Sequence, residues 1–147
     1  MDGLHGPRLT PADAGYRPLR SLLADVWARY GRPFFIAETG AEGDHRAPWL
    51  RYVGEEVRAA LAAGVPVGGV CLYPVLDHPG WDDDRHCDCG LLGRRPSYDG
   101  PRAVHAALAD ELRRQQALVA PLLAPPRRGP VQPGLTLPSR EAAWSAG

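Results

Sequence analysis

One carboxylate in this chain stands where catalytic residues are often found. Residues 33–40 read Pro-Phe-Phe-Ile-Ala-Glu-Thr-Gly, so Glu38 follows four apolar residues and precedes a Thr-Gly pair. An unbroken apolar run is typical of a strand buried on both faces, and Thr-Gly favours a turn directly after it. In barrels of alternating strands and helices, side chains at the carboxyl ends of the strands point into the active site. We therefore expect Glu38 to be the catalytic residue of this chain.

A second group of chemically capable side chains follows the next apolar run. Residues 65–73 are apolar and rich in valine, which predicts another buried strand. A long loop follows this strand, and the end of the strand and this loop carry the side chains of Tyr73, Asp77, His78 and Trp81. We expect this loop to lie beside Glu38.

Each of these residues also has a purely structural interpretation. Glu38 could cap a helix or pair with an arginine such as Arg46. Asp77 is equally suited to setting a turn, and His78 and Trp81 are equally compatible with ordinary loop positions. The sequence alone leaves these alternatives open.

The cysteines do not favour a metal site. A single residue separates Cys87 from Cys89, whereas zinc sites usually space a cysteine pair by two to four residues and add a second pair. The acidic run that precedes them lacks the alternating ligands of a calcium loop. We expect neither a metal nor a cofactor, although a small binding module built on this loop is a weaker possibility that zinc titration would test. Cys71 falls in a predicted strand and is expected to be buried.

Charge and composition restrict the partners. The chain has 147 residues, with 17 acidic and 17 basic side chains, so its formal net charge is zero and nucleic acid is not an expected partner. Its N-terminus has no signal-peptide pattern, and no apolar stretch is long enough to cross a membrane. Three cysteines, an odd number, argue against a secreted disulfide scaffold. These observations predict a cytoplasmic protein that does not contact membranes.

The apolar periodicity predicts helices alternating with strands. The expected order is helix, strand, helix, strand, helix, at about residues 13–30, 33–38, 47–63, 65–73 and 101–123. Strands separated by helices imply parallel pairing, so the predicted fold class is α/β. Residues 1–123 form one predicted domain, and the proline-rich residues 124–147 are predicted to be a disordered tail.

Two strands cannot complete a parallel sheet. Each buried strand would leave one edge of backbone N–H and C=O groups without a partner. The sequence therefore predicts a part of a larger structure, or a chain that takes missing strands from another chain.

Two segments resemble one enzyme family. Residues 36–40 are similar to the Thr-Glu-Asn-Gly signature of family 1 glycoside hydrolases, the β-glucosidase type. Residues 73–81 resemble that family's eighth-strand segment, Trp-Ser-Leu-Leu-Asp-Asn-Phe-Glu-Trp, and the similarity covers about residues 30–93. The resemblance implies a partial (β/α)₈ barrel, comprising its last two βα units with two parallel strands and three main helices.

The resemblance also implies roles for individual residues. Glu38 matches the nucleophile of a retaining glycosidase, which attacks the anomeric carbon of an O-glycoside. Trp81 matches an aromatic residue of the sugar site, and Tyr73 replaces a tryptophan there. Together with Asp77 and His78, these rings would form one wall of a carbohydrate pocket.

This chain departs from the family pattern at three points. Gly80 stands where the family has a glutamate that holds sugar hydroxyls, and Thr39 replaces an asparagine. The Asn-Glu-Pro motif that carries the general acid is absent, and one carboxylate cannot be nucleophile and acid in the same step. We expect the isolated chain to be inactive. The alternative is a non-catalytic, truncated barrel fragment that needs partner strands.

Overall fold

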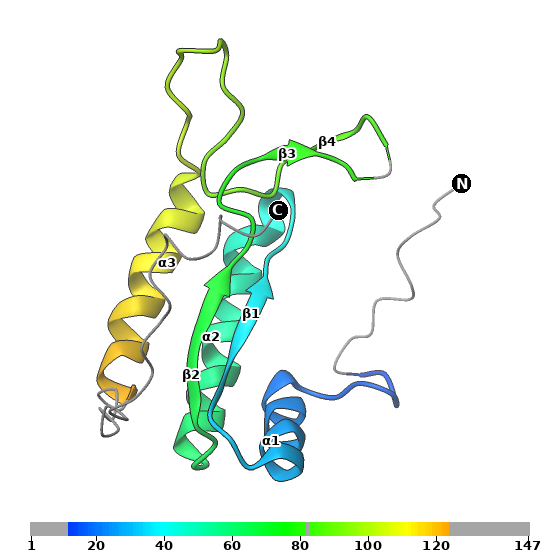
Figure 1. Cartoon of the computed structure of the whole chain (residues 1–147), viewed down its shortest axis with the longest axis vertical. Helices are drawn as coiled ribbons and strands as arrows, with labels where there is room; N and C mark the ends of the chain where they lie inside the picture. Colours follow the sequence, from blue (N-terminus) through cyan, green and yellow to red (C-terminus); the bar gives the residue numbers. More distant parts are fainter. Residues whose placement is uncertain (1–11, 82, 124–147) are drawn as a thin grey trace, which may run out of the picture.

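The three main helices and the two long strands follow one another along the chain in the predicted order. The computed structural model describes residues 12–81 and 83–123, and Figure 1 shows their arrangement. The elements are α1 (Leu19–Tyr30), β1 (Phe34–Thr39), η1 (Gly43–His45), α2 (Arg46–Ala62), β2 (Val67–Leu72), β3 (His78–Pro79), β4 (His86–Cys87), α3 (Ala106–Val119) and η2 (Ala120–Leu122). The predicted tail at residues 124–147 lies outside the described residues. Among the described helices, none has the length and apolar character that a membrane-crossing segment requires.

The helix ends differ from the prediction for identifiable reasons. Helix α1 begins at Leu19, later than predicted, because Pro18 disfavours helical geometry at the residue before it. The same helix ends at Gly31, whose φ of 59° is left-handed and whose N–H donates to the carbonyl of Trp27. Helix α3 begins only at Ala106, because the His105 imidazole caps it by accepting from the backbone N–H of Leu108.

The two long strands are parallel, as predicted. β1 pairs with β2 in the register Phe34 with Val67, Ile36 with Val70 and Thr39 with Leu72. Because the strands are parallel, their carboxyl ends lie at the same edge of the sheet. The loop after β2, which was predicted to be irregular, contains a small antiparallel hairpin of β3 and β4.

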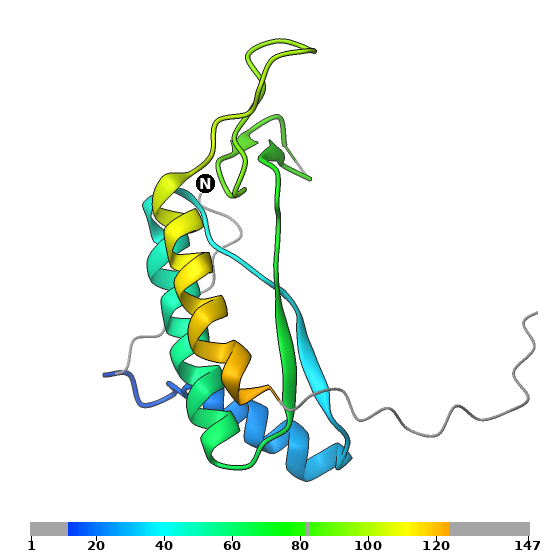
Figure 2. The same ribbon diagram turned by 90° about the vertical axis from the view of Figure 1, so that its left-hand side faces the viewer.

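The core lies between α2 and the sheet. Figure 2 shows α2 and α3 on one side of the two strands, with α1 at their amino-terminal end. Buried side chains from α1, α2, β2 and the turn before β2 form a single cluster of Leu23, Val53, Val57, Ala60, Val65 and Val67. The buried carboxylate of Glu56 ties α1 to α2 by accepting hydrogen bonds from the backbone N–H and the guanidinium of Arg20.

The opposite face of the sheet is uncovered in the described part of the chain. The Phe35 side chain is 59% exposed, and Cys71, expected to be buried, is exposed as well. The expectation of strands buried on both faces is therefore wrong for this chain by itself. The apolar residues are present, but no described element packs over them.

Helices α2 and α3 are joined by a network of polar contacts. Glu111 on α3 is 4% exposed and accepts hydrogen bonds from Arg51 of α2 and from Arg114 and Gln115 of its own helix. Burial raises the pKa of this carboxyl, but the three donors together outweigh burial and hold the pKa below its ordinary value of 4.5. At Gly54 of α2, an added Cβ would lie 2.1 Å from the Gln115 side-chain oxygen, so glycine permits this close packing.

Candidate active site

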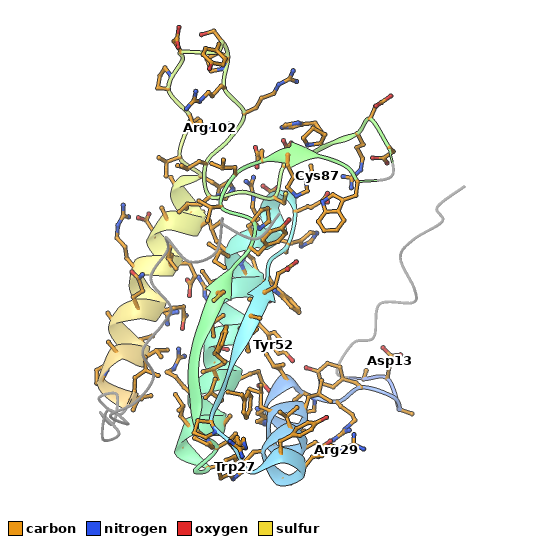
Figure 3. The ribbon with its side chains drawn as sticks, in the orientation of Figure 1. Asp13, Trp27, Arg29, Tyr52, Cys87 and Arg102 are labelled. Carbon is orange, nitrogen blue, oxygen red and sulfur yellow. The ribbon has the colours of Figure 1, made fainter. Side chains whose placement is uncertain are left out.

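An open pocket of about 280 Å³ lies at the carboxyl ends of β1 and β2. The residues that line it include Glu38 and Thr39 of β1, Tyr73 directly after β2, His78 of β3 and Cys87 of β4. In Figure 3, Cys87 marks this end of the molecule, and Trp27 of α1 lies at the other end. The structure thus brings together three of the residues singled out by the sequence: Glu38, Tyr73 and His78.

A close approach of two backbones shapes the pocket floor. The N–H of Tyr73 donates to the carbonyl of Thr39 at 2.9 Å, which continues the sheet beyond the last strand residues. A Cβ at Gly40 would lie 1.9 Å from the carbonyl oxygen of Tyr73. Only glycine fits there, so Gly40 fixes how closely Tyr73 approaches Glu38. The Thr39 hydroxyl also accepts a hydrogen bond from the Trp49 indole at 2.8 Å, which anchors this end of β1 to α2.

The Glu38 carboxylate is exposed at the pocket rim. Within residues 12–81 and 83–123 it takes part in no hydrogen bond or ion pair. The alternative pairing with Arg46 is not formed, because Arg46 donates to the carbonyls of Gly43 and Gly90, each at 2.8 Å. The side chain of Glu38 is therefore free to contact a ligand in the pocket.

His78 presents one ring nitrogen that is not used internally. Its Nδ1 lies 2.6 Å from the carbonyl oxygen of Pro79, and because a carbonyl oxygen only accepts, Nδ1 is the donor in this contact. The other nitrogen, Nε2, is then an acceptor for a hydroxyl group. The rings of His78 and Tyr73 are 6.3 Å apart, centroid to centroid.

Asp77 makes contacts within the loop and is not among the residues that line the pocket. Its side chain is 6% exposed and lies 3.9 Å from the Arg46 guanidinium, and it accepts a hydrogen bond from the N–H of Gly90 at 2.7 Å. These contacts hold the end of β2 against the segment that follows β4. They favour the interpretation of Asp77 as a turn-setting residue.

Trp81 and Gly80 lie on the hairpin turn, away from the pocket lining. Trp81 is 82% exposed. The N–H of Gly80 donates to the carbonyl of Arg85 at 2.6 Å, and a Cβ at this position would lie 2.0 Å from an Asp83 carboxylate oxygen. A side chain at this position would displace the exposed Asp83 carboxylate, so the family's glutamate would require that side chain to move.

The pocket contains a second carboxylate that was not predicted from the sequence. Glu42 also lines it, and both of its oxygens accept from Arg85, at 2.7 and 3.1 Å. The hydrogen bond to Glu42 is the largest of the influences that raise the pKa of Arg85. A carboxylate engaged in this way accepts hydrogen bonds and offers no proton. Because Arg85 lies far along the chain from Glu42, no local pattern could have indicated this pair.

Two buried thiols complete the inner side of the pocket. Burial is the largest influence on both Cys87 and Cys89, and it raises the pKa of each thiol above its ordinary value. The Cys89 thiol also donates to the carbonyl of Cys87. Both cysteines are therefore protonated near neutral pH and are poor nucleophiles.

Comparison with known proteins finds similarity only in structure. No protein-family sequence model matches this chain, and no curated protein matches it. A family 1 β-glucosidase from Thermotoga maritima superposes with a TM-score of 0.55 at 19% identity, over 64% of this chain and 24% of that one. A glucose complex of the GH1 β-glucosidase from Humicola insolens gives 0.57 at 22% identity, over 67% and 24%. The β-glycosidase from Thermosphaera aggregans gives 0.56 at 22% identity, over 74% and 22%.

These matches establish the fold. The chain spans about a quarter of the length of the solved structures that it matches. Its α/β arrangement of helices and parallel strands resembles part of the family 1 β-glucosidase barrel, as the two sequence segments predicted.

Proposed function

We propose that this chain is the C-terminal portion of a glycoside-hydrolase-like barrel, comprising its last two βα units. In this proposal, Glu38 is the nucleophile of a retaining reaction on O-glycosidic bonds. The observation that carries the proposal is the position of a carboxylate, without a partner among the described residues, in a pocket at the carboxyl ends of two parallel strands. The fold of this chain, which holds the pocket, resembles part of the β-glucosidase barrel.

The pocket would supply the nucleophile and contacts to the sugar. A Glu38 oxygen would attack the anomeric carbon while the glycosidic bond breaks, and water would later release the sugar from the resulting ester. The exposed ring of Tyr73 suits the C–H face of a pyranose, and the free Nε2 of His78 can accept from a sugar hydroxyl. Asp77 would act through the loop that it holds, and Trp81 remains an exposed ring available to a sugar or to the rest of the barrel.

The general acid of the reaction must come from outside the described residues. The departing oxygen needs a proton from a second carboxyl group about 5 Å from the nucleophile. The described carboxylate nearest in the pocket lining is Glu42, which Arg85 engages through both oxygens. We therefore expect the isolated chain to be inactive and the completed barrel to be active.

Replacing the nucleophile in a completed barrel tests the proposal. Residues 30–93 would be joined to the preceding barrel portion of a family 1 β-glucosidase, and hydrolysis of an aryl glycoside would be measured. Glu38→Gln should lower kcat by several orders of magnitude, because the amide cannot form the glycosyl ester. Glu55→Gln, on the exposed side of α2, is the matched control and should leave turnover unchanged. Full turnover by Glu38→Gln would remove Glu38 from the mechanism.

A non-catalytic fragment is the second candidate. It is favoured by the glycine at position 80, where the resembling family has a glutamate, and by the face of the sheet that the described residues leave uncovered. In that case the completed barrel would still fold, as judged by circular dichroism, but would not hydrolyse any aryl glycoside. The same chimeric protein therefore distinguishes the two functions.

A further inference from the structure

Three potential metal ligands converge beside the hairpin. Asp77, from the segment after β2, lies close to His86 of β4 and to Asp88, which follows β4. One ligand atom from each residue lies within 4.8 Å of the ligand atoms of the other two. None of the three belongs to the lining of the Glu38 pocket.

His86, one member of this cluster, has a buried ring nitrogen without a hydrogen-bond partner among the described residues. Among the described residues, the Nε2 atom of His86 is the one buried side-chain nitrogen or oxygen without a hydrogen bond. Leaving such an atom unsatisfied is unfavourable, so native structures usually supply a protein group, a water or an ion. This observation is independent of the spacing of the carboxylates, and it points to a ligand at the cluster.

We propose that Asp77, His86 and Asp88 bind one divalent metal ion that accepts mixed nitrogen and oxygen ligands, such as Zn²⁺. A neutral imidazole and two carboxylates are common ligands of this class of ion, and three protein ligands leave further positions for water. Calcium and magnesium prefer oxygen alone and are a poorer match.

The polar neighbours of the cluster leave room for the ion. The Gly90 N–H and the Arg46 guanidinium both lie against the Oδ1 atom of Asp77, at 2.7 and 3.9 Å, so Oδ2 is available to a metal. The Arg46 charge opposes a cation, but the two aspartates supply two negative charges against it. Asp88 is exposed, which gives the ion a route from solvent.

The ion would have a structural role. It would link the segment that leaves β2 to the second strand of the hairpin, and His78 lies on the first strand. The hairpin carries one wall of the Glu38 pocket, so metal binding would fix that wall. The proposal does not depend on glycoside hydrolysis, because it concerns only the folded chain.

Zinc titration of the full chain tests the proposal. After treatment with a chelator and its removal, isothermal titration with ZnCl₂ should show one site per chain, and zinc should raise the melting temperature. His86→Ala should weaken binding at least tenfold and reduce the thermal shift. His45→Ala, which removes an exposed histidine outside the cluster, should change neither quantity. Calcium and magnesium should bind much more weakly than zinc.

Further variants separate this site from other ways of holding zinc. Asp88→Asn alters an exposed ligand and should weaken binding even if His86→Ala fails to fold, whereas Asp84→Asn on the same loop should not. Replacing Cys87 and Cys89 together by serine should leave one site. If the serine variant no longer bound zinc while Asp88→Asn still bound it, the proposal would be overturned in favour of a site with cysteine thiolate ligands. Absence of any binding by the folded, chelator-treated chain would overturn it outright.

Discussion

The position of Glu38 depends on a contact between two neighbouring backbones. The β1 strand ends against the first residue after β2, and Gly40 lies so close to the Tyr73 carbonyl that no side chain can be added without a shift of the main chain. The relative placement of the proposed nucleophile and the aromatic ring is therefore set by a glycine. Glycine has no chemistry of its own, but it determines the shape of the pocket.

Gly40→Ala should destabilise the chain, because backbone atoms at the pocket floor would have to move apart. We expect the free energy of unfolding to fall by about 1–3 kcal/mol, as for other overpacked sites. Urea unfolding followed by circular dichroism at a fixed chain concentration measures this change. Gly69→Ala is the control, since an added Cβ there meets no atom within 4 Å. Equal effects of the two substitutions would contradict the close-approach argument.

At the scale of elements, charged hydrogen bonds hold α3 on α2. The carboxylate of Glu111 is almost completely buried, whereas the side chain of its partner Arg51 is 55% exposed. The pair is stabilising because each carboxylate oxygen has a donor from a charged or amide group. Burying an ionised carboxylate without such donors would be strongly unfavourable.

This interface should make stability depend on acid pH. The pKa of Glu111 is lowered by folding, so its contribution is complete above about pH 4.5 and is lost as the pH falls through the lower, folded-state pKa. Glu111→Gln should lower the free energy of unfolding at pH 7 by about 1–3 kcal/mol, and the difference should shrink below pH 4.5.

Urea unfolding between pH 7 and pH 3 measures this dependence. Asp110→Asn is the matched control, because the Asp110 side chain is 76% exposed and its ion pair with Arg113 lies at the surface. Surface pairs of this kind contribute little. A constant difference between Glu111→Gln and the unsubstituted chain across this pH range would contradict the assignment.

At the scale of the whole molecule, the sheet is incomplete. Both outer edges of the pair formed by β1 and β2 lack a neighbouring strand within the described residues. No element of the described chain covers one face of the sheet, on which Phe35 lies, and an apolar groove of about 460 Å³ runs between α2, β2 and α3. Open edges and exposed apolar faces are sites for pairing with another chain.

The isolated chain should therefore self-associate at micromolar concentration. Size-exclusion chromatography with light scattering should give a mass above that of one chain. Phe35→Lys should shift the distribution toward monomer, because the charge lies on the bare face. Tyr98→Lys, at a position that is 90% exposed on the loop before α3, should not shift it. A compact monomer of the unsubstituted chain would show that no partner strands are needed.

Local patterns in the sequence were sufficient for the three main helices, the two long strands and the position of Glu38 at a strand end. The apolar periodicity predicted the order of the helices and strands, and the helix between the strands implied the parallel pairing that the structure has. The carboxyl ends of parallel strands meet at one edge, so Glu38 and Tyr73 could be placed together from the sequence alone. These inferences succeed because they depend on neighbouring residues and on backbone geometry.

The tertiary structure decided which side chains face the pocket, the loop or solvent. Asp77 and Trp81 belong to one continuous segment, yet the first is buried and the second is almost fully exposed. The pairing of Glu42 with Arg85 and the convergence of Asp77, His86 and Asp88 join residues from different parts of the chain. Such contacts depend on how the hairpin folds back over the strand ends, and no sequence period encodes that path. The exposure of the sheet is decided in the same way, because it depends on what packs against the strands and not on the residues within them.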